Sequence, residues 1–291
     1  MSDLERISIQ AYIELALKED IGDGDHTSLA CIPASATGSA ILIAKEEGIV
    51  AGIEVAEMVF HTVDPKVIFK PLMEEGSFIR VGDRIFSVEG SSRSILTAER
   101  LSLNYVQRMS GIATQTHQLV QQIKGSKTTI LDTRKTTPNC RIFEKMAVRI
   151  GGAKNHRFGL FDMILIKDNH IDFAGGVVPA INSVHAYLEK KNKNLAIEIE
   201  VRDFNELNLV LQRGGIHRIM LDNFSVEDIK KALVLIDGKY ETEASGGITP
   251  ETLSKYAATN VDFISIGALT HHVASLDLSL KAMYQKSENN L

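Results

Sequence analysis

The sequence predicts an α/β protein whose second half is a small or incomplete (β/α) barrel, with a doubly wound parallel sheet as the alternative. After Gly125, short apolar segments alternate regularly with helical segments, whereas the residues before it mix the two types irregularly. The 291 residues are 44% hydrophobic and 24% charged, enough apolar content for one large or two modest domains. No apolar run approaches the ~18 residues of a membrane span.

The first half of the chain contains helices and strands in no regular order. The spacing of apolar residues predicts helical stretches at Ile9–Leu17, Glu54–Thr62 and Ser92–Lys124. Gly111 is expected to break the last of these into two helices. Strands are predicted at Thr37–Ala44, Gly48–Ala51, Val67–Pro71 and Arg84–Val88.

The second half repeats a strand followed by a helix, which is typical of parallel βαβ units. The predicted strands are Thr129–Asp132, Met163–Ile166, Ala196–Val201, His217–Leu221, Thr242–Ser245 and Phe263–Ile266. The predicted helices are Cys140–Ile150, Val177–Lys190, Phe204–Arg213, Ser225–Ile236 and Pro250–Thr259. Such folds keep their active sites at the carboxyl ends of the strands, so the residues there are the candidate ligands.

Positive charge is concentrated between residues 131 and 170, although the whole chain has a formal net charge of −5. Five cationic side chains adjoin predicted strand ends or the glycine-rich run GGAKNHRFG: Arg134, Lys135, His156, Arg157 and Lys167. They predict an anionic ligand with more than one negative group. Lys145 and Arg149 lie on the helical segment between these strands and are interpreted as part of a solvated stripe.

Carboxylates and a glycine pair follow the later strands. Glu198 and Glu200 occupy positions where a barrel core usually has Val, Ile or Leu, so they favour a functional role, and Asp222 is a candidate ligand because it closes the next strand. The run EASGGIT has the form of an anion nest, in which Ser245, Gly246 and Gly247 precede a helix N-terminus. With Gly267 it falls on the last two strands, where a (β/α) barrel commonly binds phosphate.

Other features limit the choice of partner and compartment. Cys31 and Cys140 fit no zinc spacing and are interpreted as free thiols in a reducing compartment, and no base is fixed beside Cys140 to make it a nucleophile. The N-terminal run MSDLERISIQ lacks the basic and apolar regions of a signal peptide, so we expect a cytoplasmic protein. The negative net charge argues against nucleic acid as a binding partner.

Arg100 and Arg108 lie two helical turns apart, and this spacing alone favours solvated side chains.

Seven runs together resemble the quinolinate phosphoribosyltransferase family: TAERLSLNYVQRMSGIAT, LDTRKTTP, GGAKNHRFGLFDMILIKDNH, IEIEV, MLDNF, EASGGIT and SIGALTH. The resemblance covers nearly the whole chain. It implies an open-faced α/β sandwich domain over residues 1–110, with a contribution from 275–291, and an incomplete (β/α) barrel over 111–274. It also implies decarboxylating transfer of a phosphoribosyl group to quinolinate, giving nicotinate mononucleotide for NAD biosynthesis.

The resemblance also implies roles for individual residues. Lys135, Lys167, Glu200 and Asp222 would act in catalysis, and Glu200 and Asp222 would hold ribose hydroxyls and Mg²⁺. Quinolinate and the leaving pyrophosphate would lie against Arg134, Lys135, His156, Arg157 and Lys167. The 5-phosphate of phosphoribosyl pyrophosphate would bind to Ser245, Gly246, Gly247 and Gly267. Arg100 would come from the partner subunit of a homodimer with a shared active site.

One short segment departs from the pattern of the family, and other functions stay open beside the resemblance. Asn139 and Cys140 stand where relatives often have Gly and Leu, and Asn tolerates the left-handed backbone that such a turn needs. The alternatives are a paralogue linked to molybdenum transport operons, another phosphosugar barrel enzyme and a non-catalytic phosphosugar-binding relative. Release of carbon dioxide from quinolinate would separate them.

Overall fold

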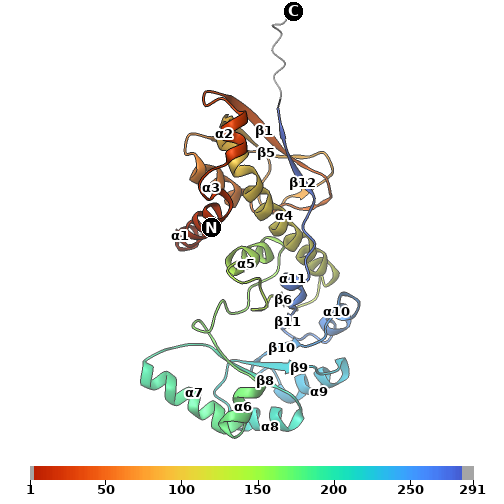
Figure 1. The fold of residues 1–291 in the computed structure, drawn as a ribbon. Coiled ribbons are helices and arrows are strands. Elements are labelled where there is room, and N and C mark those ends of the chain that lie inside the picture. Colours follow the sequence, from red (N-terminus) through yellow and green to blue (C-terminus); the bar gives the residue numbers. More distant parts are fainter. Residues whose placement is uncertain (1–2, 284–291) are drawn as a thin grey trace, which may run out of the picture. The chain divides into compact units, whose positions relative to one another are not determined.

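The structure, a computed structural model, describes residues 3–283 and contains two compact units that interleave along the sequence (Figure 1). Among the described residues, unit 1 contains 3–117, 136–152 and 272–283, and unit 2 contains 118–135 and 153–271. The predicted division at residue 110 separates two continuous segments and stays a prediction. The tail predicted to join the N-terminal domain includes 284–291, which lie outside the described residues.

Unit 1 is built on a four-stranded antiparallel sheet in the order β12-β1-β5-β3. Its strands are β1 (Thr37–Ala44), β3 (Ile68–Pro71), β5 (Arg84–Ser91) and β12 (Leu278–Ala282). A separate pair joins β2 (Gly48–Ile49) to β4 (Phe78–Ile79). The helices are α1 (Asp3–Ile21), α2 (His26–Cys31), α3 (Ile53–Val63), α5 (Arg141–Ile150) and most of α4 (Ser92–Gln122). Thus β12, close to the end of the described chain, is an integral strand of unit 1.

Helix α3 packs on this sheet through aromatic side chains. Phe60 is fully buried, and its ring centroid lies 6.2 Å from that of Phe86 on β5 and 5.9 Å from that of Phe69 on β3. Rings at such separations in tilted or edge-on arrangements contribute favourable contacts beyond the area they bury. This cluster fixes α3 against β3 and β5.

The expected break in the long helix at Gly111 is wrong, because α4 runs without interruption from Ser92 to Gln122. A Cβ on Gly111 would overlap the carbonyl oxygen of Ala274. The glycine is therefore explained by the close approach of a second backbone segment, and it does not end the helix.

Unit 2 is a six-stranded parallel sheet in the order β6-β11-β10-β9-β8-β7. The strands are β6 (Thr129–Leu131), β7 (Ile164–Ile166), β8 (Ile197–Val201), β9 (Arg218–Asp222), β10 (Glu241–Ser245) and β11 (Phe263–Ser265). Neighbours follow chain order from β7 to β11, and β6 then joins β11, as in a barrel. Within the described chain β6 and β7 do not pair, so the barrel is incomplete. This order rejects the doubly wound alternative, in which strand order reverses near the middle of the sheet.

The helices of unit 2 connect its strands, and α6 to α9 lie along one side of β8 and β9 in Figure 1. They are α6 (Asp168–Ala174), α7 (Val177–Lys191), α8 (Phe204–Arg213), α9 (Val226–Ile236), α10 (Pro250–Ala257) and α11 (Ala268–His271). Short helices α6 and α11 were not predicted. The helix predicted between the first two barrel strands is α5, which belongs to unit 1. In the part of the chain that the structure describes, no helix is long and apolar enough to cross a membrane.

Candidate active site

A lysine and two carboxylates meet at the carboxyl ends of β7, β8 and β9. Lys167 follows β7, and its Nζ lies 2.9 Å from Oε2 of Glu200 on β8. Asp222 ends β9, and burial, followed by the negative charge of Glu200, raises its pKa. Burial and a neighbouring negative charge both destabilise the ionised form of Asp222. A cation close to Asp222 and Glu200 would relieve this effect.

Two arginines form a cationic part of the same unit. Burial lowers the pKa of Arg157 most, and the positive charge of Arg134 lowers it further, which places the two guanidinium groups within electrostatic reach of each other. Nη1 of Arg157 donates to the carbonyl oxygen of Met163 at 3.2 Å. Nε of Arg134 is buried without a hydrogen-bond acceptor in the described structure. Because a buried unpaired donor is costly, this site is suited to an anion that accepts from Arg134.

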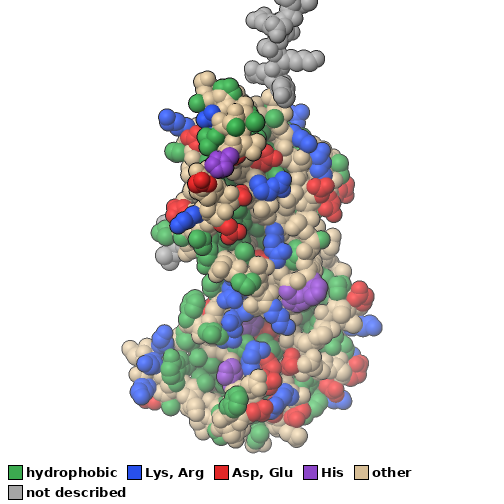
Figure 2. Space-filling view, viewed as in Figure 1, with side chains coloured by type: hydrophobic (Ala, Val, Ile, Leu, Met, Phe, Trp, Pro, Cys, Tyr) green, Lys and Arg blue, Asp and Glu red, His purple; other side chains and the backbone are tan. Residues whose placement is uncertain are grey.

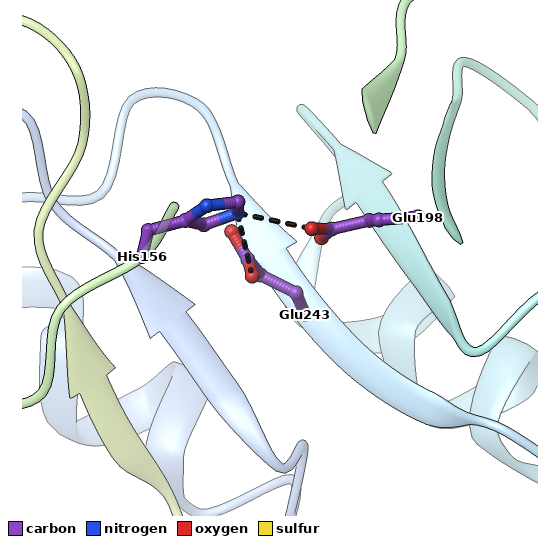
Figure 3. A group of neighbouring side chains, drawn as sticks. All are labelled: His156, Glu198 and Glu243. Carbon is purple, nitrogen blue, oxygen red and sulfur yellow. Dashed lines mark ion pairs between the residues drawn. The ribbon is translucent and has the colours of Figure 1, made fainter. Parts of the chain in front are cut away.

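His156 turns toward two buried carboxyl groups in the barrel interior (Figure 3). Its Nε2 lies 3.0 Å from Oε2 of Glu198 on β8 and 3.6 Å from Oε2 of Glu243 on β10. Both glutamates are 0% exposed. Burial is the main cause that raises the pKa of Glu198 to about 7 and that of Glu243 to about 8, and their proximity adds to the shift at Glu243. The barrel interior next to His156 thus contains two carboxyl groups with raised pKa values.

The ligand atoms of His156, Glu198 and Glu243 lie within 4.8 Å of one another, a spacing that a metal ion could bridge. We assign no metal to this group, because Arg218 already supplies a positive charge. Its Nη1 lies 3.2 Å from Oε2 of Glu243, and its guanidinium carbon lies 4.0 Å from the ring centroid of Phe263. The three side chains and Arg218 form a buried cluster of ionisable groups in the barrel interior.

Sequence reasoning missed Glu243 as a site residue, although a signal was available. Side chains two apart on a strand share a face. Glu243 therefore faces the same side of β10 as Ser245, just as Glu198 shares a face of β8 with Glu200. Alternation along these strands would have placed Glu243 on the same side as the predicted anion nest.

Asp132 holds the loop that carries His156 and was also missed. It is fully buried directly after β6, accepts from the backbone N–H of His156 at 2.8 Å and accepts from Nδ2 of Asn155 at 2.6 Å. The backbone N–H of Arg157 in turn donates to Nδ1 of His156 at 2.7 Å. These hydrogen bonds anchor the run GGAKNHRFG to the end of β6, the strand that Arg134 follows.

The predicted anion nest has the backbone that such a site needs. Gly246 and Gly247 have φ values of 92° and 61°, and a Cβ on Gly247 would meet open space. Thr249 and Thr252 form a capping box at the start of α10, with Pro250 in the first turn. Left-handed glycines before a helix N-terminus present backbone N–H groups to an anion.

Lys135 lies over the last strand of the barrel. A Cβ on Gly267 would be 3.0 Å from Cδ of Lys135, so Gly267 leaves room for the lysine side chain. Oγ1 of Thr270 donates to the carbonyl oxygen of Lys135 at 2.8 Å. These contacts connect the segment after β6 to the segment after β11. The predicted barrel residues thus all lie in unit 2, at or near strand ends.

Arg100 is the one predicted site residue outside unit 2. It lies exposed on α4 in unit 1, and its role in a partner's site stays a prediction. Arg108, on the same helix, is half-buried and its Nη2 lies 2.6 Å from Oε1 of Glu144, so the solvated interpretation is wrong for Arg108. Lys145 is only 1% exposed, so it does not belong to a solvated stripe, whereas Arg149 is exposed.

The turn around Cys140 agrees with two sequence predictions. Asn139 has a left-handed φ of 63°, as the substitution of glycine by asparagine predicted. Burial, followed by the negative charge of Glu144, raises the pKa of the Cys140 thiol. A raised pKa disfavours the thiolate, which argues against a nucleophilic role. The face that Figure 2 shows carries both acidic and basic side chains.

Comparison with known proteins connects this geometry to one family. The models of the quinolinate phosphoribosyl transferase N-terminal and C-terminal domains match residues 25–110 and 112–281. A decarboxylating quinolinate phosphoribosyltransferase of Nicotiana tabacum is 46% identical over 94% of this chain and 82% of its own length. The carboxylating nicotinate-nucleotide pyrophosphorylase of Mycobacterium leprae is 39% identical over 96% of this chain and 99% of its own length.

Solved structures agree with the sequence relatives. NadC of Streptococcus pyogenes has a TM-score of 0.92 at 38% identity and covers 98% of this chain and 100% of its own. The nicotinate-nucleotide pyrophosphorylase of Francisella tularensis has a TM-score of 0.88 at 40% identity and covers 95% of this chain and 96% of its own.

Proposed function

Because the chain belongs to the quinolinate phosphoribosyltransferase family, we propose that it transfers the phosphoribosyl group of phosphoribosyl pyrophosphate to quinolinate. The products are nicotinate mononucleotide, pyrophosphate and carbon dioxide, and the reaction serves NAD biosynthesis. The observation that carries the proposal is the buried, unpaired Nε of Arg134 close to Arg157. Two like charges with a free donor suit a substrate with two carboxylates.

The arginines orient quinolinate. Arginine binds a carboxylate through two parallel N–H donors, which lysine cannot do. Arg134 and Arg157 therefore bind the two substrate carboxylates. His156 lines the quinolinate pocket beside these arginines, and its Nε2 is directed toward Glu198 and Glu243. This arrangement selects for quinolinate over nicotinate, whose single carboxylate would leave a desolvated arginine donor unpaired.

Phosphoribosyl pyrophosphate occupies the carboxyl ends of β8 to β11. Glu200 and Asp222 hold the ribose hydroxyls, and the glycine nest after Ser245 holds the 5-phosphate. The carboxylate oxygens of Glu200 and Asp222 are the hard ligands that Mg²⁺ prefers, and these two residues would hold it. Burial, followed by the charge of Glu200, raises the pKa of Asp222, which favours a nearby cation. Bound there, Mg²⁺ would neutralise charge on the pyrophosphate.

The chain's own residues then assist two bond changes. Lys135 and Lys167 stabilise the departing pyrophosphate as the bond from ribose C1 to oxygen breaks, while Glu200 and Asp222 stabilise positive charge on the ribose. The pyridine nitrogen bonds to C1, and the resulting pyridinium ring accepts the electron pair that remains when carbon dioxide leaves. A proton then adds to the same ring carbon.

We further propose a homodimer in which Arg100 of one subunit completes the site of the other. Arg100 is exposed on α4, as an arginine that acts outside its own unit must be.

Cys31 and Cys140 are free thiols, which supports a reducing compartment such as the cytoplasm. Some plant relatives are named chloroplastic or mitochondrial, and that location is said of those proteins.

Release of carbon dioxide from carboxyl-labelled quinolinate tests the function. We expect release that requires both phosphoribosyl pyrophosphate and Mg²⁺, with formation of nicotinate mononucleotide in equal amount. Nicotinate in place of quinolinate serves as the matched control and should react slower by several orders of magnitude. Equal use of nicotinate would contradict the two-carboxylate site, and no turnover of quinolinate would contradict the function. The alternatives with other substrates are not favoured, because the relatives reported above bear the names of this one activity.

A further inference from the structure

Asn223, between the carboxylate at the end of β9 and the glycine turn after β10, makes contacts that no role has yet explained. These two strands are neighbours in the sheet (Figure 1). Asp222 stands opposite Ser245 in their register. Asn223 is the first residue after β9 and is exposed. It therefore lies where the ribose and phosphate portions of the proposed substrate would meet.

Asn223 fixes the carboxylate of its neighbour. Its Nδ2 donates to Oδ2 of Asp222 at 2.6 Å. Asp222 carries a repulsive neighbour in Glu200, so a directed donor holds one oxygen in place and leaves the other for a ligand. A charge-assisted hydrogen bond of this length restricts the rotation of a carboxylate strongly.

The same residue shapes the glycine turn. The backbone N–H of Asn223 donates to the carbonyl oxygen of Ser245 at 2.8 Å. A Cβ on Gly246 would overlap Oδ1 of Asn223 and would lie 2.9 Å from its backbone nitrogen. Gly246 is therefore required by its contact with Asn223 as well as by its φ of 92°. Asn223 itself has a left-handed φ of 57°, which asparagine tolerates better than most residues.

We propose that Asn223 is a positioning residue that fixes the Asp222 carboxylate relative to the Gly246 turn, so that ribose and 5-phosphate are bound in one register. The inference rests on the proposed function, because phosphoribosyl pyrophosphate is the ligand that would contact both. Asn223 acts through Asp222 and Gly246. Its loss weakens the use of phosphoribosyl pyrophosphate and leaves the binding of quinolinate unchanged.

Asn223→Gly tests this role, because glycine keeps the left-handed backbone and removes only the amide. We expect KM for phosphoribosyl pyrophosphate to rise roughly 10- to 100-fold, the usual cost of losing a residue that orients a ligating group, while KM for quinolinate changes less than about twofold. Asn192→Gly is the matched control, since Asn192 is an exposed asparagine with a φ of 49° at the end of α7. It should leave both constants unchanged.

A double-variant cycle separates positioning from a general effect on folding. In an Asp222→Asn background, Asn223→Gly should add a smaller loss than it causes in the unaltered protein, because one of the two groups through which it acts, the Asp222 carboxylate, is gone. Equal losses in both backgrounds, or a parallel rise in both KM values, would overturn the proposal. If the unaltered protein failed to convert quinolinate, the proposed function would fail; an active protein with an unaffected Asn223→Gly variant would refute only the role of Asn223.

Discussion

At the scale of single residues, the site is a set of charges whose strengths are set by burial. Arg134 and Arg157 repel each other, and so do Glu200 and Asp222. Burial raises the pKa of Glu198 to about 7 and that of Glu243 to about 8. Each repulsion is relieved by a ligand of opposite sign. These charges suit the negatively charged substrate pair and the cation that we propose for the site.

Replacement of Arg134 by lysine tests the bidentate interaction. Lysine keeps the charge and loses the parallel donors, so we expect KM for quinolinate to rise roughly 10- to 100-fold with a small change in KM for phosphoribosyl pyrophosphate. Steady-state kinetics with each substrate varied in turn provides the measurement. Arg213→Lys at the end of α8 is the control and should behave as the unaltered protein. A lysine variant with unchanged KM for quinolinate would show that Arg134 does not orient it.

Replacement of Glu243 by glutamine should change the pH dependence of folding stability. Burial raises the pKa of Glu243 to about 8, so the folded state favours its protonated form. Its contribution to stability is then complete below the ordinary pKa of a glutamate and is lost as the pH rises through about 8. Glutamine cannot ionise, so the free energy of unfolding of Glu243→Gln should fall less between pH 5 and pH 9.

Urea unfolding at several pH values measures this difference. Glu241→Gln is the matched control, because Glu241 lies on the same strand, pairs with the same Arg218 and has a side chain that is 55% exposed. It should keep the decline of the unaltered protein. An identical decline in Glu243→Gln would mean that Glu243 is ionised throughout this range.

At the scale of elements, periodicity found most of the regular structure, because burial imposes it directly. β1 and α8 have the predicted bounds, and the ends of the six barrel strands differ from the predicted ends by at most one residue. Sequence reasoning failed where a short helix follows a strand without an apolar repeat of its own. Helix α6 is an example, because Lys167 both follows β7 and is the N-cap of α6.

The change in stability of a Gly111→Ala variant distinguishes an ordinary helix glycine from a glycine required by the close approach of another backbone segment. Glycine in an ordinary helix interior is less favourable than alanine by about 1 kcal/mol, so Gly111→Ala would stabilise an isolated helix. Here the added Cβ would overlap the carbonyl oxygen of Ala274, and we expect a loss of about 1–3 kcal/mol in the free energy of unfolding. Asn104→Ala, at an exposed position of α4, is the control and should be neutral or slightly stabilising. A more stable Gly111→Ala variant would contradict the close approach.

The candidate site was predictable in part. Features that depend on neighbouring residues could be predicted from the sequence, and contacts between distant residues could not. Strand ends and a glycine pair are local features, so the sequence could place Lys167, Asp222 and Gly246 at the ends of strands; their roles stay predictions. The contact of Asn223 with Gly246 joins two strands, and the ion pair of Arg108 with Glu144 joins two helices. Such pairings depend on the packing of elements far apart in the chain, which no local pattern encodes.

At the scale of the whole molecule, the proposed shared site predicts complementation. An Arg100→Ala subunit lacks the arginine it would lend, and a Lys135→Ala subunit lacks a lysine of its own barrel. In a mixed dimer, one of the two sites would receive both residues intact. We expect each variant alone to lose most activity and the verified heterodimer to recover up to about half, measured as carbon dioxide release. A heterodimer without recovery would contradict the sharing.

The path of the chain between the units also fixes the order in which the protein can be completed during synthesis. Unit 1 contains the first hundred residues, yet its four-stranded sheet includes β12, which is formed by residues 278–282. A nascent chain therefore leaves the ribosome with its first sheet one strand short, and every strand of unit 2 emerges before that sheet can close. The unit that is begun first is finished last, and the exposed edge of β1 must wait for almost the whole chain before it is paired.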